Sequence, residues 1–222
     1  MQSKIAHAAE RKAFGLVVDQ IIKTASGPDR EKQLDKLLDM AENLLRDTAP
    51  GTIRGLRAGL YPGSKWEEFL WKVIDETDHH VLKTSIMAGG YEAAFRGLRN
   101  TTANAEKYQC NVPWIILFDP TSACNKHCVG CWAADYGNQL NLTYEEMDRL
   151  VTEGAELGCH LYMLTGGEPL VRKRDVIRLA EAHEDCVFNI FTNASLIDQA
   201  FCDDVKRLGN IVFSVSLEGT PA

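Results

Sequence analysis

The chain has 222 residues, of which 45% are hydrophobic and 25% are charged, so it is long enough to bury a core in one large domain or two small ones. Its longest apolar runs, such as residues 114–118, are far short of the roughly 20 residues that a membrane span needs. The N-terminal sequence carries charges throughout and lacks the apolar stretch and cleavage site of an export signal. We therefore expect neither a membrane span nor secretion.

Cysteine content and charge narrow the class of protein further. Seven cysteines without an export signal indicate a reducing compartment, where clustered thiols serve metal or redox chemistry, so we expect a cytoplasmic protein. Residues 1–110 hold 16 Lys and Arg against 15 Asp and Glu, a net charge of +1, whereas residues 111–222 hold 8 against 16, a net charge of −8. The acidic second half argues against nucleic acid as a main partner.

The first half of the chain has the apolar spacing of helices and no strand pattern. Helical periodicity and helix caps predict helices over residues 4–24 and 31–46, from Ser64 onward, and over residues 81–104. The first two are separated by a turn at residues 26–28 and are expected to be antiparallel. Ser64 with Glu67 has the spacing of a capping box, and Gly89 with Gly90 is a weak point in the last helix. We assign residues 1–110 to a helical region of unknown role.

From Pro113 the pattern changes to alternating strands and helices. Strands are predicted over residues 114–118, 159–164, 187–191 and 211–217, and helices over 143–157, 174–183 and 196–208. The first strand is bulky and apolar throughout, which predicts that both its faces are covered. Four strands separated by three helices indicate an α/β fold with a parallel βαβ array. In such arrays the chemistry lies at the carboxyl ends of the strands.

Each notable motif follows a predicted strand. A cysteine loop follows the first strand, Thr165-Gly166-Gly167-Glu168-Pro169 follows the second, Asn193 follows the third, and Ser216 with Glu218 ends the fourth. Because the carboxyl ends of parallel strands share one edge of the sheet, we expect these motifs to lie close together.

The cysteine loop places Cys124, Cys128 and Cys131 within eight residues. Three thiolates on one loop can hold a compact cluster, and they leave one iron of a four-iron cluster with an open coordination position, as catalytic metals require. The alternative is a zinc site that uses His127 or a remote cysteine as its fourth ligand. Zinc sites, however, usually pair two ligands on each of two separated knuckles.

The spacing CxxxCxxC after the first strand, followed by GGEP after the second, resembles the radical S-adenosylmethionine (radical SAM) superfamily. The resemblance implies a partial parallel (β/α) barrel, with a [4Fe–4S] cluster held by Cys124, Cys128 and Cys131. It also implies that S-adenosylmethionine chelates the unique iron through its amino and carboxylate groups. An electron from the cluster then cleaves this cofactor to a 5′-deoxyadenosyl radical, which abstracts hydrogen from a substrate. A flavodoxin- or ferredoxin-like electron donor is implied as a partner.

The same resemblance assigns cofactor-binding residues. The turn formed by Thr165, Gly166, Gly167, Glu168 and Pro169 is expected to meet the amino group of the cofactor, with Glu168 acting on the ligand or buttressing the loop. Asn193, Ser216 and Glu218 are expected to hold its ribose and carboxylate, although Asn193 has the alternative role of a helix cap.

The residue before the third cysteine departs from the family pattern. The family often has an aromatic residue there that contacts the adenine, whereas this chain has Gly130. We expect the backbone around Gly130, or the ring of Trp132, to face the adenine. The alternative for Trp132 is a core aromatic under the loop. Cys159, Cys186 and Cys202 are expected to be structural, as small buried hydrophobes, and the role of Cys110 stays open.

The family core usually has six βα units, and four are recognisable here. We expect residues 111–222 to be a radical SAM core that is incomplete at its C-terminus, and this fragment to be poorly active alone. The substrate stays open between a peptide or protein and a small molecule or lipid precursor. The competing hypothesis is a non-catalytic iron–sulfur or zinc protein in electron transfer or assembly.

Overall fold

The structure is a computed structural model that describes residues 4–25, 27, 29–44, 51–133, 137 and 139–217. The chain divides into two compact units, Met1–Met87 and Ala88–Ala222, and each is described by itself. The division lies before Pro113, where the sequence pattern changes, because the last helical segments of the first half belong to the second compact unit. No helix among the described residues has the length and apolar character to cross a membrane.

The first unit is helical, as the apolar spacing predicts. Its helices are α1 (Lys4–Ala25), α2 (Arg30–Leu44), α3 (Thr52–Gly59), α4 (Lys65–Glu76) and α5 (His79–Ser85). Ser64 caps α4 by accepting the Glu67 amide at 3.1 Å, which confirms that predicted start. The Glu67 carboxylate accepts the Gly63 amide instead of the Ser64 amide that a capping box would use. Helix α3 was not predicted.

The helix predicted over residues 81–104 is present as three successive segments. After α5 the chain continues in η1 (Ile86–Gly97), which is π-helical, and then in α6 (Leu98–Tyr108). The Gly89-Gly90 pair lies inside η1, so the predicted weak point changes the hydrogen-bond register of the helix and does not end it.

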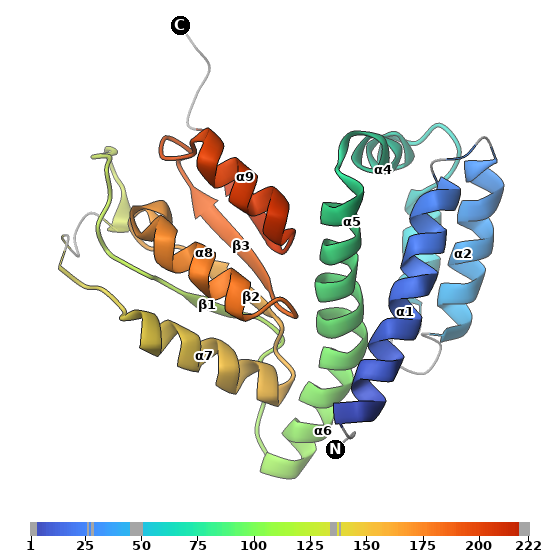
Figure 1. The fold of residues 1–222 in the computed structure, drawn as a ribbon, viewed down its shortest axis with the longest axis horizontal. Coiled ribbons are helices and arrows are strands. Elements are labelled where there is room, and N and C mark those ends of the chain that lie inside the picture. The colour runs from blue at the N-terminus through green and yellow to red at the C-terminus, as the bar shows by residue number, and fades with distance from the viewer. Residues whose placement is uncertain are drawn as a thin grey trace, which may run out of the picture. The chain divides into compact units, whose positions relative to one another are not determined.

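The second unit contains the predicted parallel sheet. Strands β1 (Ile116–Phe118), β2 (Leu161–Leu164), β3 (Val187–Thr192) and β4 (Ile211–Val215) pair in the order β1-β2-β3-β4, all parallel. They alternate with α7 (Tyr144–Leu157), the 3₁₀ turn η3 (Pro169–Arg172), α8 (Lys173–Ala182) and α9 (Gln199–Leu208), and the three α-helices cover one face of the sheet (Figure 1). This arrangement confirms the α/β fold class and is that of a section of a parallel (β/α) barrel.

The core lies between the sheet and these helices. Alternate strand residues point toward the helices and are buried, among them Tyr162, Leu164, Phe188 and Ile190. The rings of Tyr162 and Phe188 stack with centroids 5.7 Å apart, and the Tyr162 hydroxyl lies 2.9 Å from the Val151 carbonyl oxygen of α7. Burying a side chain of this size contributes roughly 1.5–3 kcal/mol, so this layer holds the sheet and the helices together.

Three details of the predicted elements are wrong. The first strand is not covered on both faces, since Trp114 is 59% and Leu117 is 57% exposed. The helix predicted from residue 196 begins at Gln199, because the Asp198 side chain accepts the Phe201 amide at 2.9 Å and caps the helix there. Cys159 and Cys186 are buried as expected, but Cys202 is exposed on α9.

Candidate functional site

The cysteine loop leaves β1 and returns to the start of α7. Cys124 is half-buried, Cys128 and Cys131 are exposed, and none of the three forms a disulfide. The Cys131 amide donates to the Cys128 carbonyl at 3.3 Å across a turn in which Gly130 has φ +76°. Two of the three thiols therefore face solvent from one tight turn.

The three cysteines of the loop are not among the preformed metal-ligating sets. Among the described residues, only His160, Asp185 and Cys186 form such a set, with ligand atoms within 4.8 Å of one another.

The turn after β2 is docked on the beginning of this loop by three backbone hydrogen bonds. The Thr165 amide donates to the Phe118 carbonyl at 3.2 Å. The Gly167 amide donates to the Thr121 carbonyl at 3.0 Å, and the Glu168 amide donates to the Ala123 carbonyl at 2.8 Å. The last of these acceptors immediately precedes Cys124. The two motifs that the sequence places after neighbouring strands are therefore brought together.

The two glycines of the turn are required by this docking. Gly166 has φ +105°, and a Cβ atom there would lie 2.5 Å from the Thr121 carbonyl oxygen. A Cβ atom on Gly167 would collide with the Ala123 carbonyl group. Any side chain at either position would push the turn away from the cysteine loop.

Glu168 is 1% exposed, and its carboxylate is fully used inside the protein. One carboxylate oxygen accepts the Leu170 amide at 3.0 Å and the Thr192 hydroxyl at 2.7 Å. The other accepts the Asn193 amide at 2.9 Å. These bonds connect the turn after β2 to the end of β3, with Pro169, which is buried, as the first residue of η3. Of the two roles expected for Glu168, its contacts are those of a buttress.

Asn193 lies at the end of β3 and contacts the cysteine loop. Its side-chain amide donates to Asn125 Oδ1 at 3.0 Å, while the Asn125 side-chain amide donates to the Ser195 hydroxyl at 2.8 Å. Asn193 Oδ1 accepts the Ser195 amide at 3.0 Å, so Asn193 closes a local turn. It does not cap α9, whose cap is Asp198. The alternative role proposed for Asn193 is therefore wrong.

A cavity of about 540 Å³ opens between the GGEP turn and the cysteine loop. It is lined by Asp119, Ser122, Trp132, Ala133, Gln139, Leu140, Asn141, Leu142, Gly166 and Gly167. Trp132 is 63% exposed, so it is not a core aromatic. The volume lies within the usual range for small-molecule sites, roughly 300–1,000 Å³.

The remaining predicted residues lie around this edge. The Thr165 hydroxyl donates to Asp119 at 2.6 Å, which fixes an exposed carboxylate of the cavity wall. Ser216 is exposed just beyond β4, where its amide donates to the Thr192 carbonyl at 3.0 Å. Glu218 lies outside the described residues.

Arg172 is a site residue that the sequence does not identify. Its Nη1 donates to the Leu142 carbonyl at 2.8 Å and to the Pro120 carbonyl at 3.3 Å, and its Nε donates to Asp175 at 2.7 Å. Pro120 and Leu142 are the two ends of the cysteine loop, so one guanidinium clamps both. Its position, four residues after Glu168, is a weak signal, because a basic residue there is equally typical of an exposed helix start.

The model of the Radical SAM superfamily matches residues 118–222. An AdoMet-dependent heme synthase of Methanosarcina barkeri is 31% identical over 116 residues, which are 50% of this chain and 33% of the relative. An Fe-coproporphyrin III synthase of the same organism is 32% identical over 108 residues, 47% of this chain and 27% of the relative. A GTP 3′,8-cyclase of Marinobacter nauticus is 45% identical over 113 residues, 48% of this chain and 34% of the relative.

The matched segments thus span about a third of the length of these curated relatives. Among solved structures, Streptococcus suis SuiB bound to precursor peptide SuiA aligns with a TM-score of 0.45 and 19% identity. That alignment covers 64% of this chain and 30% of SuiB.

Proposed function

Because residues 118–222 belong to the radical SAM superfamily, we propose that the protein is a radical SAM enzyme whose cysteine loop holds a [4Fe–4S] cluster. Its cofactor site is the cavity beside the GGEP turn. The observation that carries the proposal is the docking of Gly167 and Glu168 on the segment that ends at Cys124, which unites the two motifs at one edge of the sheet.

The residues of the loop suit a polynuclear cluster. Cys124, Cys128 and Cys131 offer three thiols from one loop, without disulfides. Three ligands satisfy three irons of a four-iron cluster and leave the fourth for a small-molecule ligand. The family match and the position of all three thiols on one loop favour the cluster over the mononuclear zinc alternative, since zinc sites usually pair ligands on two separated knuckles.

The bound cluster supplies the electron for cleavage of S-adenosylmethionine to methionine and a 5′-deoxyadenosyl radical, which abstracts hydrogen from the substrate. The residues of the chain itself bind and orient S-adenosylmethionine. Gly166 and Gly167 line the cavity, and their lack of a Cβ atom lets the turn lie directly against the cysteine loop. Trp132 offers an exposed ring at the same cavity for the adenine, in place of the aromatic that Gly130 lacks.

Glu168 and Asn193 act in this proposal as positioning residues. The Glu168 carboxylate joins the turn after β2 to β3, and the Asn193 side chain joins β3 to the cysteine loop at Asn125. Thr165 orients Asp119 at the cavity wall. Ser216 and Glu218, which follow β4, are proposed to contact the ribose and carboxylate of the cofactor.

The partners proposed are S-adenosylmethionine, a flavodoxin- or ferredoxin-like electron donor and a substrate that abstraction of hydrogen transforms. Exposure of Cys128 and Cys131 gives a donor access to the cluster side of the loop. We also propose that residues 111–222 are the catalytic core and residues 1–110 a helical region, of which residues 88–110 belong to the same compact unit as the core. We propose that the protein works in a reducing compartment such as the cytoplasm.

Anaerobic reconstitution of the 222-residue chain with iron and sulfide tests the proposal. We expect about four irons per chain, a brown protein, and an electron paramagnetic resonance spectrum of the reduced cluster that changes when S-adenosylmethionine is added. Cys128→Ala should lose the cluster, while Cys202→Ala, which removes an exposed thiol elsewhere, should keep it.

A colourless protein whose stoichiometric zinc is lost in the Cys128→Ala variant would instead establish the zinc-binding alternative for the loop. A four-iron spectrum that ignores S-adenosylmethionine would establish a non-catalytic iron–sulfur protein. A Cys128→Ala variant with a full cluster would refute the ligand assignment.

A further inference from the structure

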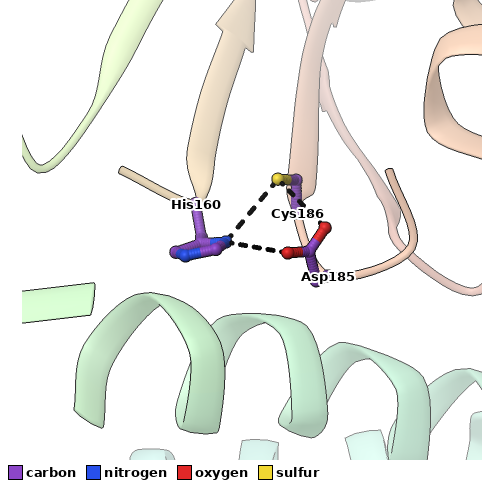
Figure 2. Close-up of side chains that lie close together, drawn as sticks. All are labelled: His160, Asp185 and Cys186. Atoms are coloured by element: carbon purple, nitrogen blue, oxygen red, sulfur yellow. Dashed lines mark hydrogen bonds and ion pairs between the residues drawn. The ribbon is translucent and has the colours of Figure 1, made fainter. Parts of the chain in front are cut away.

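A second group of metal-ligating side chains lies at the opposite edge of the sheet from the cysteine loop. His160 immediately precedes β2, and Asp185 with Cys186 immediately precedes β3. Because Leu161 pairs with Val187 in the parallel register, His160 and Cys186 are neighbours across the two strands. Figure 2 shows the three side chains converging from these two strand starts.

The spacing of the three side chains matches the edges of a coordination tetrahedron. His160 Nδ1 lies 3.5 Å from Asp185 Oδ2 and 3.7 Å from Cys186 Sγ, and Cys186 Sγ lies 3.7 Å from Asp185 Oδ1. Ligands at the usual zinc distances, about 2.0–2.3 Å, are separated by roughly 3.3–3.6 Å around a tetrahedral ion. The two Asp185 contacts use different carboxylate oxygens, and one ligand atom from each residue gives a set within 4.8 Å. The three can therefore meet one ion after a turn of the Asp185 carboxylate and shifts of about 1 Å.

Two of the three side chains are buried, and the third is partly exposed to solvent. His160 is 1% exposed and Cys186 is fully buried, while the Asp185 side chain is 37% exposed. An ion would thus enter, and a water molecule would complete its coordination, on the Asp185 side. One sulfur, one nitrogen and one oxygen ligand form a mixed donor set that suits borderline-soft ions such as Zn²⁺ or Co²⁺ better than Mg²⁺ or Ca²⁺.

The surrounding charges complement a divalent ion. Burial lowers the pKa of the His160 imidazole and raises the pKa of the Cys186 thiol, so both are neutral without an ion. The buried Glu92 carboxylate lies 3.2 Å from the Arg96 guanidinium, which in turn lies 3.5 Å from His160 Nε2.

When a divalent ion is bound, its two positive charges and that of Arg96 equal the three negative charges of the Cys186 thiolate, Asp185 and Glu92. The environment is thus electrically balanced when an ion is bound.

We propose that His160, Asp185 and Cys186 form a mononuclear site for a zinc-type divalent ion, bound through His160 Nδ1, one Asp185 oxygen and Cys186 Sγ. The site joins the starts of β2 and β3 beside η1, and it is independent of the function proposed for the cysteine loop. Binding converts the Cys186 thiol to a thiolate and releases its proton to solvent, with no redox change.

The test uses the full chain carrying Cys124→Ser, Cys128→Ser and Cys131→Ser, so that the loop cannot bind metal through thiolates. Anaerobic titration with Co²⁺ should then give one ion per chain, visible d–d bands of a tetrahedral site and a near-ultraviolet band from one thiolate. Zn²⁺ should displace the Co²⁺ and abolish both signals.

In that background, Cys186→Ser should remove the thiolate band, and Asp185→Ala should weaken Co²⁺ binding by at least about 100-fold, the upper end of what loss of an outer partner costs. Cys159→Ser is the matched control, because Cys159 is also buried beside β2 but lies outside the set, and it should bind as the background does. Asp185→Ala changes a partly exposed side chain, so its effect on Co²⁺ affinity can be measured even if Cys186→Ser fails to fold.

Absence of a Co²⁺ spectrum in the folded background chain would overturn the proposal. So would a Co²⁺ affinity that Asp185→Ala leaves unchanged. In either case the three side chains form only a hydrogen-bond network that joins the two strands.

Discussion

The Thr192 hydroxyl donates a hydrogen bond of 2.7 Å to Glu168, and both residues are almost completely buried. Thr192 is the last residue of β3 and Glu168 belongs to the turn after β2, so this contact and the Asn193 amide bond to the same carboxylate tie two strand ends together. The cavity wall formed by the turn is therefore held from behind by β3.

Glu168→Gln should destabilise the protein. The carboxylate accepts three hydrogen bonds, and an amide must present its NH₂ group to at least one donor, which leaves a buried donor unsatisfied at a cost of about 1–3 kcal/mol. Urea unfolding measures the loss. Glu184→Gln, at an exposed position, is the control and should change the unfolding free energy by less than about 0.5 kcal/mol. Equal stability of the two variants would contradict the buttress role.

Gly167→Ala should separate the GGEP turn from the cysteine loop, because its methyl group would collide with the Ala123 carbonyl. Gly130→Ala is the matched comparison: it lies in the cysteine loop with open space around it, and it incurs only the backbone strain of a positive φ, about 1–2 kcal/mol.

Hydrogen exchange of the Gly167 and Glu168 amides distinguishes these effects. Both amides should exchange faster in the Gly167→Ala variant and stay protected in the Gly130→Ala variant, where the docking bonds are intact. Protected amides in Gly167→Ala would show that the docking does not need a glycine.

Arg172→Met should loosen both ends of the cysteine loop, since it removes the donors to Pro120 and Leu142 while keeping an apolar stem. We expect faster hydrogen exchange at the Ser122 and Leu142 amides, which donate across the base of the loop to the Leu140 and Pro120 carbonyls. Arg174→Met is the control, because Arg174 is exposed two residues later. If these amides exchange at the same rate in Arg172→Met and Arg174→Met, Arg172 does not stabilise the ends of the loop.

Asp198→Asn should destabilise the protein in a pH-dependent way. The hydrogen bond from Lys173 and the Phe201 amide hold the pKa of Asp198 below its ordinary value of 3.8. A carboxyl group with a lowered pKa in the folded state stabilises the fold above its unfolded pKa and loses this contribution as the pH falls through the folded pKa. The difference between wild type and Asp198→Asn should thus be constant near neutral pH and shrink toward zero in acid.

Urea unfolding over a pH series measures that difference. The asparagine can still cap α9, so the pH-dependent part of the difference in unfolding free energy comes from the negative charge of Asp198. Lys173→Met supplies the control, because without its ammonium group much of the pH-dependent difference should vanish. A difference that is independent of pH would assign the effect to capping alone.

The sequence predicts the parallel array because its apolar runs and caps are local signals. Thr143 with Glu146 forms the predicted capping box of α7, and the strands lie where the apolar runs do. Exposure of Trp114 and Leu117 could not be predicted, since it depends on what lies against each face of β1. The start of α9 was missed because Asp198 competes with earlier residues for the cap.

For the site, the motifs predict which segments meet but not how they are held. The cysteine loop and the GGEP turn do lie side by side, as expected for neighbouring strand ends. The anchors Asn125 and Arg172 carry no motif, because the fold sets their partners: the Asn193 and Ser195 side chains for Asn125, and backbone carbonyls for Arg172. The cluster of His160 and Cys186 requires the β2–β3 register, which residue types alone do not give.

The strand order β1-β2-β3-β4 also bears on how the sheet assembles. Each strand pairs with the strand synthesised just before it, so no pairing waits for a distant part of the chain, and the entropy of closing each loop stays small. As the chain leaves the ribosome, each new helix and strand can add to an edge that is already formed. The cysteine loop, which emerges between β1 and α7, then acquires its docking partner as soon as β2 and the following turn have been made.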